Sequence, residues 1–272
     1  MTILQSNQTL AVIGCGTMGE AIVRGILANG ALAPSQIIAS DMRPEVVKAL
    51  TEKHGIRATT DNLVAANEAH TALLCVKPYQ LATLLENAAM KDALKNKVVI
   101  SIAAGVRLEK LMGFLPQSQV IRAMPNTPIL ISEGMTALCR AKAVKDEAMR
   151  FALALFSSAG RAQEIDEAQM DIVTAVAGSG PAFMFVMIDA LADGAVRMGL
   201  RRDLAVAFAT QTMQGAARMV AQTGSHPGVL KDQVTTPGGC TAAGLSVMED
   251  GKIRSVLART IEEATRAAGK LG

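Results

Sequence analysis

Short, largely hydrophobic runs lie along the first part of the chain at residues 10–13, 37–39, 72–76 and 98–102, and a further strand pattern lies at 119–122. Runs of this kind are typical of strands that are buried on both faces of a parallel sheet. Helical patterns lie between them, and this alternation predicts an α/β fold with a mostly parallel sheet. Two more strands are expected at residues 135–140 and 161–165, with a helix at about 145–157 between them.

The strand signals stop near Ile165, and the rest of the pattern is helical, at about 166–177, 181–198, 203–222 and 253–268. We therefore predict an α/β domain over residues 1–165 and an all-helical domain over residues 166–272. The helix at 181–198 is apolar on nearly every side apart from Asp189 and Asp193, so it must be buried on more than one face. The helical domain is too small to surround it alone, and we expect a homodimer in which these helices interlock.

A glycine motif follows the first hydrophobic run and opens the first helix. Its residues are Gly14, Cys15, Gly16, Thr17, Met18 and Gly19, which match the pattern G-x-G-x-x-G in the context of a strand followed by a helix. The first glycine permits a tight turn, the second lets the backbone approach a pyrophosphate, and the third lets the helix pack against the strand. The motif predicts a Rossmann-like, dinucleotide-binding first domain; a glycine-rich turn without a ligand is the alternative.

The second hydrophobic run ends in Ser40 and Asp41, where a ribose-binding residue is expected. A carboxylate there accepts hydrogen bonds from an adenosine ribose diol and repels a 2′-phosphate, which favours NAD. Arg43 is close by, however, and an arginine at this place accepts a 2′-phosphate. A third interpretation is that Asp41 only caps the next helix, which Pro44 opens.

The ends of the later runs carry further candidate residues. Because the carboxyl ends of parallel strands meet at one edge of a sheet, Lys77, the turn Ala103-Ala104-Gly105 and Asn126 are expected in one crevice with the glycine motif. A lysine at a strand end is usually only solvated, and small residues at 103–105 can simply relieve crowding. The same small residues would equally let a flat ring lie on the backbone.

The helical domain contains a second turn, Thr235-Thr236-Pro237-Gly238-Gly239-Cys240-Thr241. Proline fixes one backbone angle, the glycines allow conformations that other residues avoid, and a helix begins near Thr241. Backbone N–H groups at such a place form a clamp for a carboxylate or a phosphate. An ordinary loop with a threonine helix cap is the competing interpretation.

Composition excludes several classes of function. The net charge is only +3 and basic residues do not cluster, so a nucleic-acid partner is not expected. The four cysteines and three histidines lack metal-binding spacing, so no metal site is expected. Residues 1–10 lack a secretory pattern. The uncharged stretch 172–188 is interrupted at 178–181, and a membrane span needs about 20 unbroken apolar residues, so we expect a cytoplasmic protein without one.

Several motifs in order give the chain a resemblance to the pyrroline-5-carboxylate reductases, which make proline, over essentially its whole length. They are the glycine motif, Val76-Lys77-Pro78, residues 101–105, 124–128, 178–182 and 189–194, and above all the stretch 226–249 around the second turn. The resemblance implies a Rossmann-like domain followed by a helical dimerisation domain, with NADPH as the first cofactor candidate and NADH as the second. It also implies a homodimer at least, with larger rings in relatives.

The resemblance assigns site residues as well. The cofactor would be held by the glycine motif, Ser40, Asn62, Cys75 to Pro78 and Ile102 to Ala104, with Gln233 reaching it from the helical domain. The substrate would be held by Glu167 and by Gly239, Cys240 and Thr241. Relatives often have Ala or Thr at position 240, and a cysteine there would make the enzyme more sensitive to thiol oxidation. Some relatives have Ser at position 41, which leaves the cofactor preference open.

The expected reaction is hydride transfer to a cyclic imine that carries a carboxylate. The N–H groups around residues 239–241 would bind the carboxylate, and Thr241 Oγ would hydrogen-bond the ring nitrogen, so Thr241 is the catalytic candidate. A protonated imine is already electrophilic, so a strong acid is unnecessary. An imine reductase or a β-hydroxyacid dehydrogenase is the first alternative, although the latter needs a lysine and residues 167–198 contain none. A non-catalytic dinucleotide sensor is the second.

Overall fold

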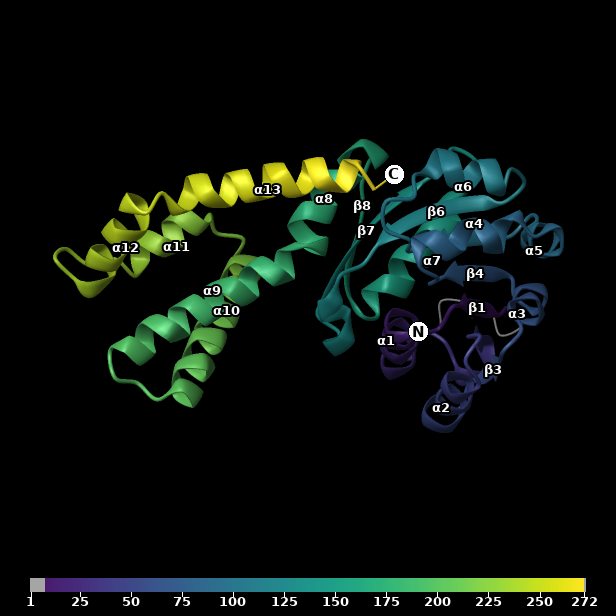
Figure 1. The fold of residues 1–272 in the computed structure, drawn as a ribbon, viewed down its shortest axis with the longest axis horizontal. Coiled ribbons are helices and arrows are strands. Elements are labelled where there is room, and N and C mark those ends of the chain that lie inside the picture. The colour runs from purple at the N-terminus through teal and green to yellow at the C-terminus, as the bar shows by residue number, and fades with distance from the viewer. Residues whose placement is uncertain (1–7, 272) are drawn as a thin grey trace. The chain divides into compact units, whose positions relative to one another are not determined.

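The computed structural model describes residues 8–271, so the first seven positions of the predicted N-terminal pattern lie outside the described residues. The chain forms two compact units (Figure 1). The first comprises the described residues up to Ser179 together with those from Ala264 onward, and the second is Gly180–Glu263. The division at residue 165, which was inferred from the end of the strand signals, remains a separate proposal about functional domains.

The first unit contains an eight-stranded sheet in the order β3-β2-β1-β4-β5-β6-β7-β8. Every neighbouring pair is parallel except β6 and β7, which confirms the predicted mostly parallel sheet. Its strands are β1 (Leu10–Ile13), β2 (Ile37–Ser40), β3 (Arg57–Thr59), β4 (Thr71–Leu74), β5 (Val98–Ser101), β6 (Gln119–Met124), β7 (Gly134–Arg140) and β8 (Gly160–Glu164).

Two details differ from the sequence prediction. The fourth strand ends at Leu74, so Cys75 and Val76 lie beyond its carboxyl end and not inside the strand. The short edge strand β3 gave no hydrophobic run because its residues are only partly buried. An edge strand has one neighbour and one open side, which removes the pressure for a continuous apolar pattern.

The helices of the first unit fall into two groups that match the switch in strand order. Contacts join α1 to α2 and α7, and they join α3 to α5 and α5 to α4. Right-handed crossovers on either side of β1 place such groups on opposite faces of a sheet. The elements are α1 (Thr17–Ala28), η1 (Pro34–Gln36), α2 (Pro44–His54), α3 (Asn62–Glu68), α4 (Pro78–Glu86), α5 (Ala88–Leu94), α6 (Leu108–Phe114), η2 (Thr127–Ile131), α7 (Asp146–Ser157), η3 (Glu167–Gln169), α8 (Met170–Val173) and the π-helix η4 (Thr174–Gly178).

The core of this unit forms between the sheet and its helices. Leu10, Ile13, Leu73 and Ile100 are completely buried on the central strands, and Phe156 of α7 is completely buried beside them. Strands that are covered on both faces need apolar side chains on both faces, which explains why their sequences are continuous hydrophobic runs.

The second unit consists of helices joined by short loops. It comprises α9 (Gly180–Arg197), α10 (Arg202–Thr223), α11 (Pro227–Gln233), α12 (Cys240–Asp250) and most of α13 (Ile253–Gly269), and α9 packs against α10. His226 caps α11, since its Nδ1 accepts the Gly228 N–H at 3.1 Å. His226 thus marks the start of this helix, with Pro227 at its first position.

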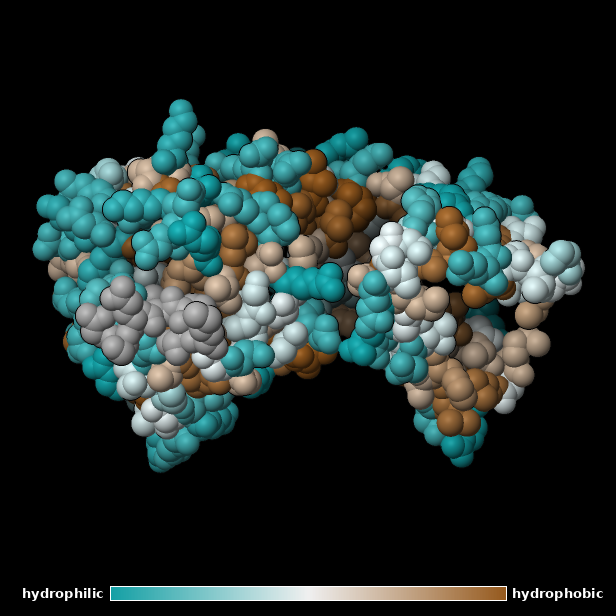
Figure 2. Space-filling model, turned by 180° about the vertical axis from the view of Figure 1, so that it is seen from behind, coloured by the Kyte–Doolittle hydropathy of each residue, from teal (hydrophilic) through white to brown (hydrophobic). Residues whose placement is uncertain are grey.

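Helix α9 is open to solvent in the single chain. Only Gly180 and Ala192 of this helix are buried, whereas Phe185 is 63% exposed. Hydrophobic residues also gather on the visible surface of the second unit (Figure 2). By length and composition alone, the helical stretch Glu167–Arg197 could cross a membrane. In its apolar segment of 18 residues, 17% is buried. An exposed apolar surface of this kind marks an interaction site.

Candidate functional site

The glycine motif forms a tight turn between β1 and α1. Gly14 has φ +78°, and a Cβ at this position would lie 2.6 Å from Val76 Cγ1. The Gly14 and Cys15 N–H groups donate to the Ser40 carbonyl at 2.9 and 2.8 Å, which ties the turn to the end of β2. Gly16 caps α1 without a side-chain hydrogen bond. The positive end of α1 is therefore open to an anionic group.

A cavity of about 900 Å³ lies at the carboxyl ends of β1, β2 and β4. This is the edge at which the strand order switches, where ligands of open α/β sheets bind. The cavity brings together eight of the predicted cofactor residues, namely Gly14, Gly16, Asp41, Arg43, Asn62, Cys75, Val76 and Lys77. The cavity has the size of a cofactor site.

Sequence reasoning missed the other residues of this cavity. Met42 and Thr60 follow β2 and β3, and their position just beyond a strand end was the available signal. The remaining ones come mainly from α3, α4 and α5, and only the packing of these helices reveals them: Asp61, Leu63, Tyr79, Gln80, Thr83, Leu84, Asn87 and Met90. Tyr79 is 79% exposed and Met42 is 73% exposed, so both offer apolar surface to a flat ring.

Asp41 and Arg43 form a bidentate ion pair at the mouth of the cavity. Arg43 Nε lies 2.9 Å from Oδ1 of Asp41, and Arg43 Nη2 lies 3.1 Å from Oδ2. The Arg43 backbone N–H also donates to Oδ1 at 3.1 Å. Burial raises the pKa of Asp41, but the hydrogen bonds and charge of Arg43 outweigh it and hold that pKa below its usual value. The aspartate is thus ionised and engaged at neutral pH.

The side chains of Ser40 and Cys15 are completely buried. Within residues 8–271, Ser40 Oγ has no hydrogen-bond partner, and the same holds for Asn62 Oδ1. Asn62 also lines the cavity, so this unpaired acceptor is placed for a donor on a ligand. Burial and the nearby carboxylates of Glu20 and Asp41 raise the pKa of Cys15 to about 12, and burial raises the pKa of Cys75 well above its usual value. Both thiols are therefore protonated and unreactive.

The remaining predicted cofactor residues lie outside this cavity lining. Thr17, Met18 and Gly19 form the first turn of α1, and Pro78 opens α4. Ile102 is tied to β4, since its N–H donates to the Leu74 carbonyl at 3.1 Å. Ala103 is buried and Ala104 is partly exposed. In the same turn, a Cβ at Gly105 would lie 2.6 Å from Leu271 Cβ, so the end of the described chain covers part of this turn.

The Asn126 side chain is hydrogen-bonded within the protein through both its nitrogen and its oxygen. Its amide donates to the Ala177 carbonyl at 3.0 Å, and its oxygen accepts the Met135 N–H at 2.8 Å. Asn126 is 8% exposed. These bonds connect the loop after β6 to β7 and to the π-helix, so the structure gives Asn126 a role in holding that helix.

Glu167, the expected substrate ligand of the first unit, is also engaged. Its Oε1 accepts the Leu108 N–H at 2.6 Å and lies 3.2 Å from Arg122 Nη1. Arg122 is 4% exposed, and its Nη2 lies 3.9 Å from Asp171 Oδ1. One side of the Glu167 carboxylate thus stabilises the start of α6, and its side chain remains 34% exposed.

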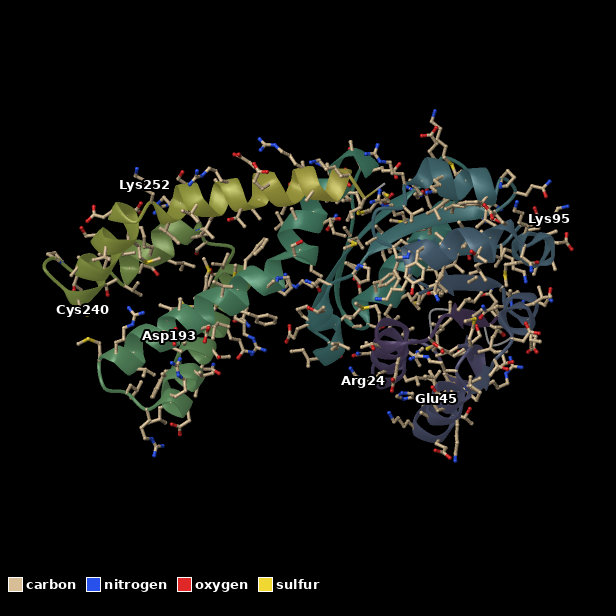
Figure 3. The ribbon with its side chains drawn as sticks, viewed as in Figure 1. Arg24, Glu45, Lys95, Asp193, Cys240 and Lys252 are labelled. Atoms are coloured by element: carbon tan, nitrogen blue, oxygen red, sulfur yellow. The ribbon has the colours of Figure 1, made fainter. Side chains whose placement is uncertain are left out.

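The second turn lies in the second unit and begins a helix, as expected. Gly238 has φ +66°, and the Gly239 N–H donates to the Thr236 carbonyl at 3.0 Å. Gly239 caps α12 without a side-chain hydrogen bond, which leaves the N–H groups at the start of that helix available. Cys240 is exposed at the first position of α12 (Figure 3), and Thr241 beside it is partly buried. Gln233 is exposed at the end of α11.

Family models match both parts of the chain. The model described as pyrroline-5-carboxylate reductase dimerisation matches residues 167–271, and the one described as NADP oxidoreductase, coenzyme F420-dependent, matches residues 9–105. The dimerisation family accounts for the exposed apolar surface of α9, because a partner subunit would cover it.

Relatives match over nearly the whole length. The pyrroline-5-carboxylate reductase of Methanosarcina acetivorans is 40% identical over 267 residues, which is 98% of each chain. A pyrroline-5-carboxylate reductase structure from Coxiella burnetii has a TM-score of 0.93 at 32% identity, covering 98% of this chain and 99% of that one. The Plasmodium falciparum pyrroline carboxylate reductase with NADP bound has a TM-score of 0.87 at 28% identity, covering 99% of this chain and 100% of that one. This chain therefore belongs to the pyrroline-5-carboxylate reductase family.

Proposed function

We propose that this protein reduces 1-pyrroline-5-carboxylate to L-proline, the last step of proline biosynthesis, with a hydride from NAD(P)H. The observation that carries this proposal is the full-length match to enzymes named for the reaction, which includes both glycine turns. The protein is thus an oxidoreductase that acts on a C=N bond.

The first unit fits a nicotinamide dinucleotide. The cavity has the volume for one, a Cβ at Gly14 would collide with Val76, and Asn62 Oδ1 offers an unpaired acceptor. Such a cofactor, when bound, supplies the hydride. Gly14 and Gly16 would hold its pyrophosphate against the start of α1, and Lys77 would add positive charge. We propose NADPH as the working cofactor and NADH as the second candidate; the relative with NADP bound supports this order.

The second unit supplies the substrate clamp in this proposal. The N–H groups of Gly239, Cys240 and Thr241 would bind the carboxylate at the start of α12, where the helix dipole favours an anion. Thr241 Oγ would hydrogen-bond the ring nitrogen and orient the imine for attack at its carbon. Glu167 would contribute from its exposed side, and Gln233 would reach the cofactor. The reaction requires this clamp to meet the nicotinamide in the assembled enzyme.

The active form in this proposal is an oligomer. Phe185 and its apolar neighbours on α9 are exposed in the single chain. The region that matches the dimerisation family includes this helix. We propose a homodimer at least, with a ring of dimers as the larger form, working in the cytoplasm without a nucleic acid or membrane partner. The residues from 166 onward would then form the substrate-binding and dimerisation domain, and residues 1–165 the dinucleotide-binding domain.

A steady-state comparison of substrates and cofactors tests the reaction. Oxidation of NADPH and of NADH is followed with pyrroline-5-carboxylate and with other cyclic imines, and reduction of NADP+ and of NAD+ is followed with a set of β-hydroxyacids. We expect turnover with pyrroline-5-carboxylate to exceed every other substrate. Dinucleotide binding without turnover of any of these compounds would instead support the sensor hypothesis.

A further inference from the structure

The residue that follows β2 conventionally distinguishes NAD from NADP. In this chain it is Asp41, and its carboxylate is already bound by Arg43. Three contacts from Arg43 reach the Asp41 carboxylate, two on Oδ1 and one on Oδ2. The Asp41 side chain is only 9% exposed. A ribose diol needs the same carboxylate oxygens and would have to displace a bidentate arginine.

The Arg43 guanidinium, by contrast, has donors to spare. Its side chain is 58% exposed, and Nη2 lies 3.4 Å from the place that a Cβ on Gly16 would occupy. A guanidinium has five N–H donors, and Asp41 takes one from Nε and one from Nη2. Within residues 8–271, no other group takes the two N–H groups of Nη1 or the second one of Nη2, and Arg43 lines the cavity. Three donors in a fixed fork suit a phosphate.

The ion pair also fixes where this fork is. A free arginine side chain on a surface samples many rotamers, and ordering it on binding costs free energy. Asp41 is held in turn, because its own N–H donates to the Thr59 carbonyl at 3.2 Å on β3. Arg43 is the N-cap residue of α2, and the positive end of this helix adds to the attraction for an anion.

We propose that Asp41 is a positioning residue that holds Arg43 at the cavity mouth, so that the chain recognises the 2′-phosphate of NADP(H) through Arg43. Asp41 is then not the ligand of the ribose diol. This inference rests on the proposed use of a nicotinamide dinucleotide in this cavity, and it predicts that an aspartate at the end of β2 favours NADPH here.

Calorimetric titration of the full-length protein with 2′,5′-ADP and with 5′-AMP tests the inference without any turnover. The two ligands share the adenosine and the 5′-phosphate, so the ratio of their affinities reports the 2′-phosphate alone. We expect the wild type to bind 2′,5′-ADP about 10- to 100-fold more tightly than 5′-AMP. Arg43→Gln should remove this preference and leave the affinity for 5′-AMP unchanged.

Asp41→Asn distinguishes positioning from direct binding, since it keeps the shape and removes the charge. We expect it to lower the affinity for 2′,5′-ADP severalfold and to leave the affinity for 5′-AMP unchanged. It should also raise the KM for NADPH more than the KM for NADH. The inference is wrong if Asp41→Asn lowers the affinity for 5′-AMP or NADH and raises the affinity for 2′,5′-ADP, because a residue that binds the ribose diol would behave in this way. It is also wrong if Arg43→Gln leaves the preference intact.

Arg57→Gln is the matched control. Arg57 lies on the neighbouring strand β3, pairs with Glu68 and does not line the cavity, so both affinities should stay at wild-type values. Thermal unfolding of each variant confirms that it is folded. A preference for 2′,5′-ADP that persists while pyrroline-5-carboxylate is not reduced would overturn the proposed reaction and leave the role of Arg43 standing.

Discussion

The Arg122 guanidinium lies against the Glu167 carboxylate, with Nη1 3.2 Å from Oε1, although Arg122 is 4% exposed. The buried positive charge is balanced by Glu167 on one side and by Asp171 on the other. Nη2 of Arg107 in turn lies 3.8 Å from Oδ2 of Asp171. This network joins β6 to the start of α6 and to η3 and α8, so a residue expected at the substrate also holds the first unit together.

Arg122→Met should therefore destabilise the protein. It removes the cation between two carboxylates, and we expect the free energy of unfolding to fall by about 2 kcal/mol. The estimate lies below the value for fully buried pairs because both carboxylates are about a third exposed. Urea denaturation at pH 7.5 measures the change. Arg57→Met removes an exposed ion pair and should cost less than about 1 kcal/mol; equal costs for the two variants would contradict the prediction.

Gly14→Ala should weaken dinucleotide binding in a folded protein. The left-handed φ and the contact with Val76 mean that an added methyl group forces the turn away from its position. We expect the affinity for NADPH, measured by fluorescence titration, to fall more than about tenfold, since a misplaced backbone loses its hydrogen bonds to the pyrophosphate.

Gly113→Ala is the control for that experiment. Gly113 lies inside α6, and a Cβ there meets open space, so alanine should raise stability by about 0.5–1 kcal/mol and leave NADPH binding unchanged. Wild-type NADPH binding in Gly14→Ala would show that the turn tolerates a side chain, against the assigned role.

Thr241→Ala should lower kcat/KM for pyrroline-5-carboxylate. The lost hydrogen bond to a charged ring nitrogen is worth about 1–3 kcal/mol, which corresponds to about 5- to 150-fold. Ser246→Ala, further along α12, removes an exposed hydroxyl and should leave the kinetics unchanged. Unaltered kinetics in Thr241→Ala would remove the catalytic role from this residue.

The buried thiol of Cys15 should make the protein less stable at alkaline pH. Its pKa is about 12 in the folded state, against about 8.5 for a free thiol, so the unfolded chain loses its proton first as the pH rises. Stability is then complete below pH 8.5 and declines between pH 8.5 and 12, by at most about 1.4 kcal/mol per pH unit for this thiol.

The Cys15→Ala variant isolates that effect. Urea denaturation at pH 7.5 and at pH 9.5 should show a smaller loss of stability between the two values in Cys15→Ala than in the wild type, whatever the cost of the lost volume. An identical loss in both proteins would mean that Cys15 ionises alike in the folded and unfolded chains.

Phe185→Glu should dissociate the oligomer. Phe185 is 63% exposed on α9 in the single chain, and a charge there cannot be buried against a partner without a large penalty. Light scattering after size exclusion should give a smaller mass than the wild type and a lower specific activity. Lys95→Glu, on the exposed surface of the first unit (Figure 3), should keep the wild-type mass. A Phe185→Glu protein of wild-type mass would exclude α9 from the interface.

The sequence by itself determined the alternation of strands and helices, the glycine turn after β1 and the helix start at residues 239–241. These features depend on local rules, because a strand buried on both faces must be apolar and a tight turn needs glycine. Eight of the predicted cofactor residues meet in the cavity for the same reason, since parallel strands end at one edge.

Only the tertiary structure decided how the polar residues are used. Asp41 binds Arg43, Asn126 binds the Ala177 carbonyl, and Glu167 balances the charge of Arg122. Each pairing depends on how the elements pack or on a side-chain rotamer. The strand β3 and the lining from α4 and α5 were missed because edge strands and helix faces leave no local signal of what they contact. A sequence specifies which groups can pair, and the fold selects which of them do.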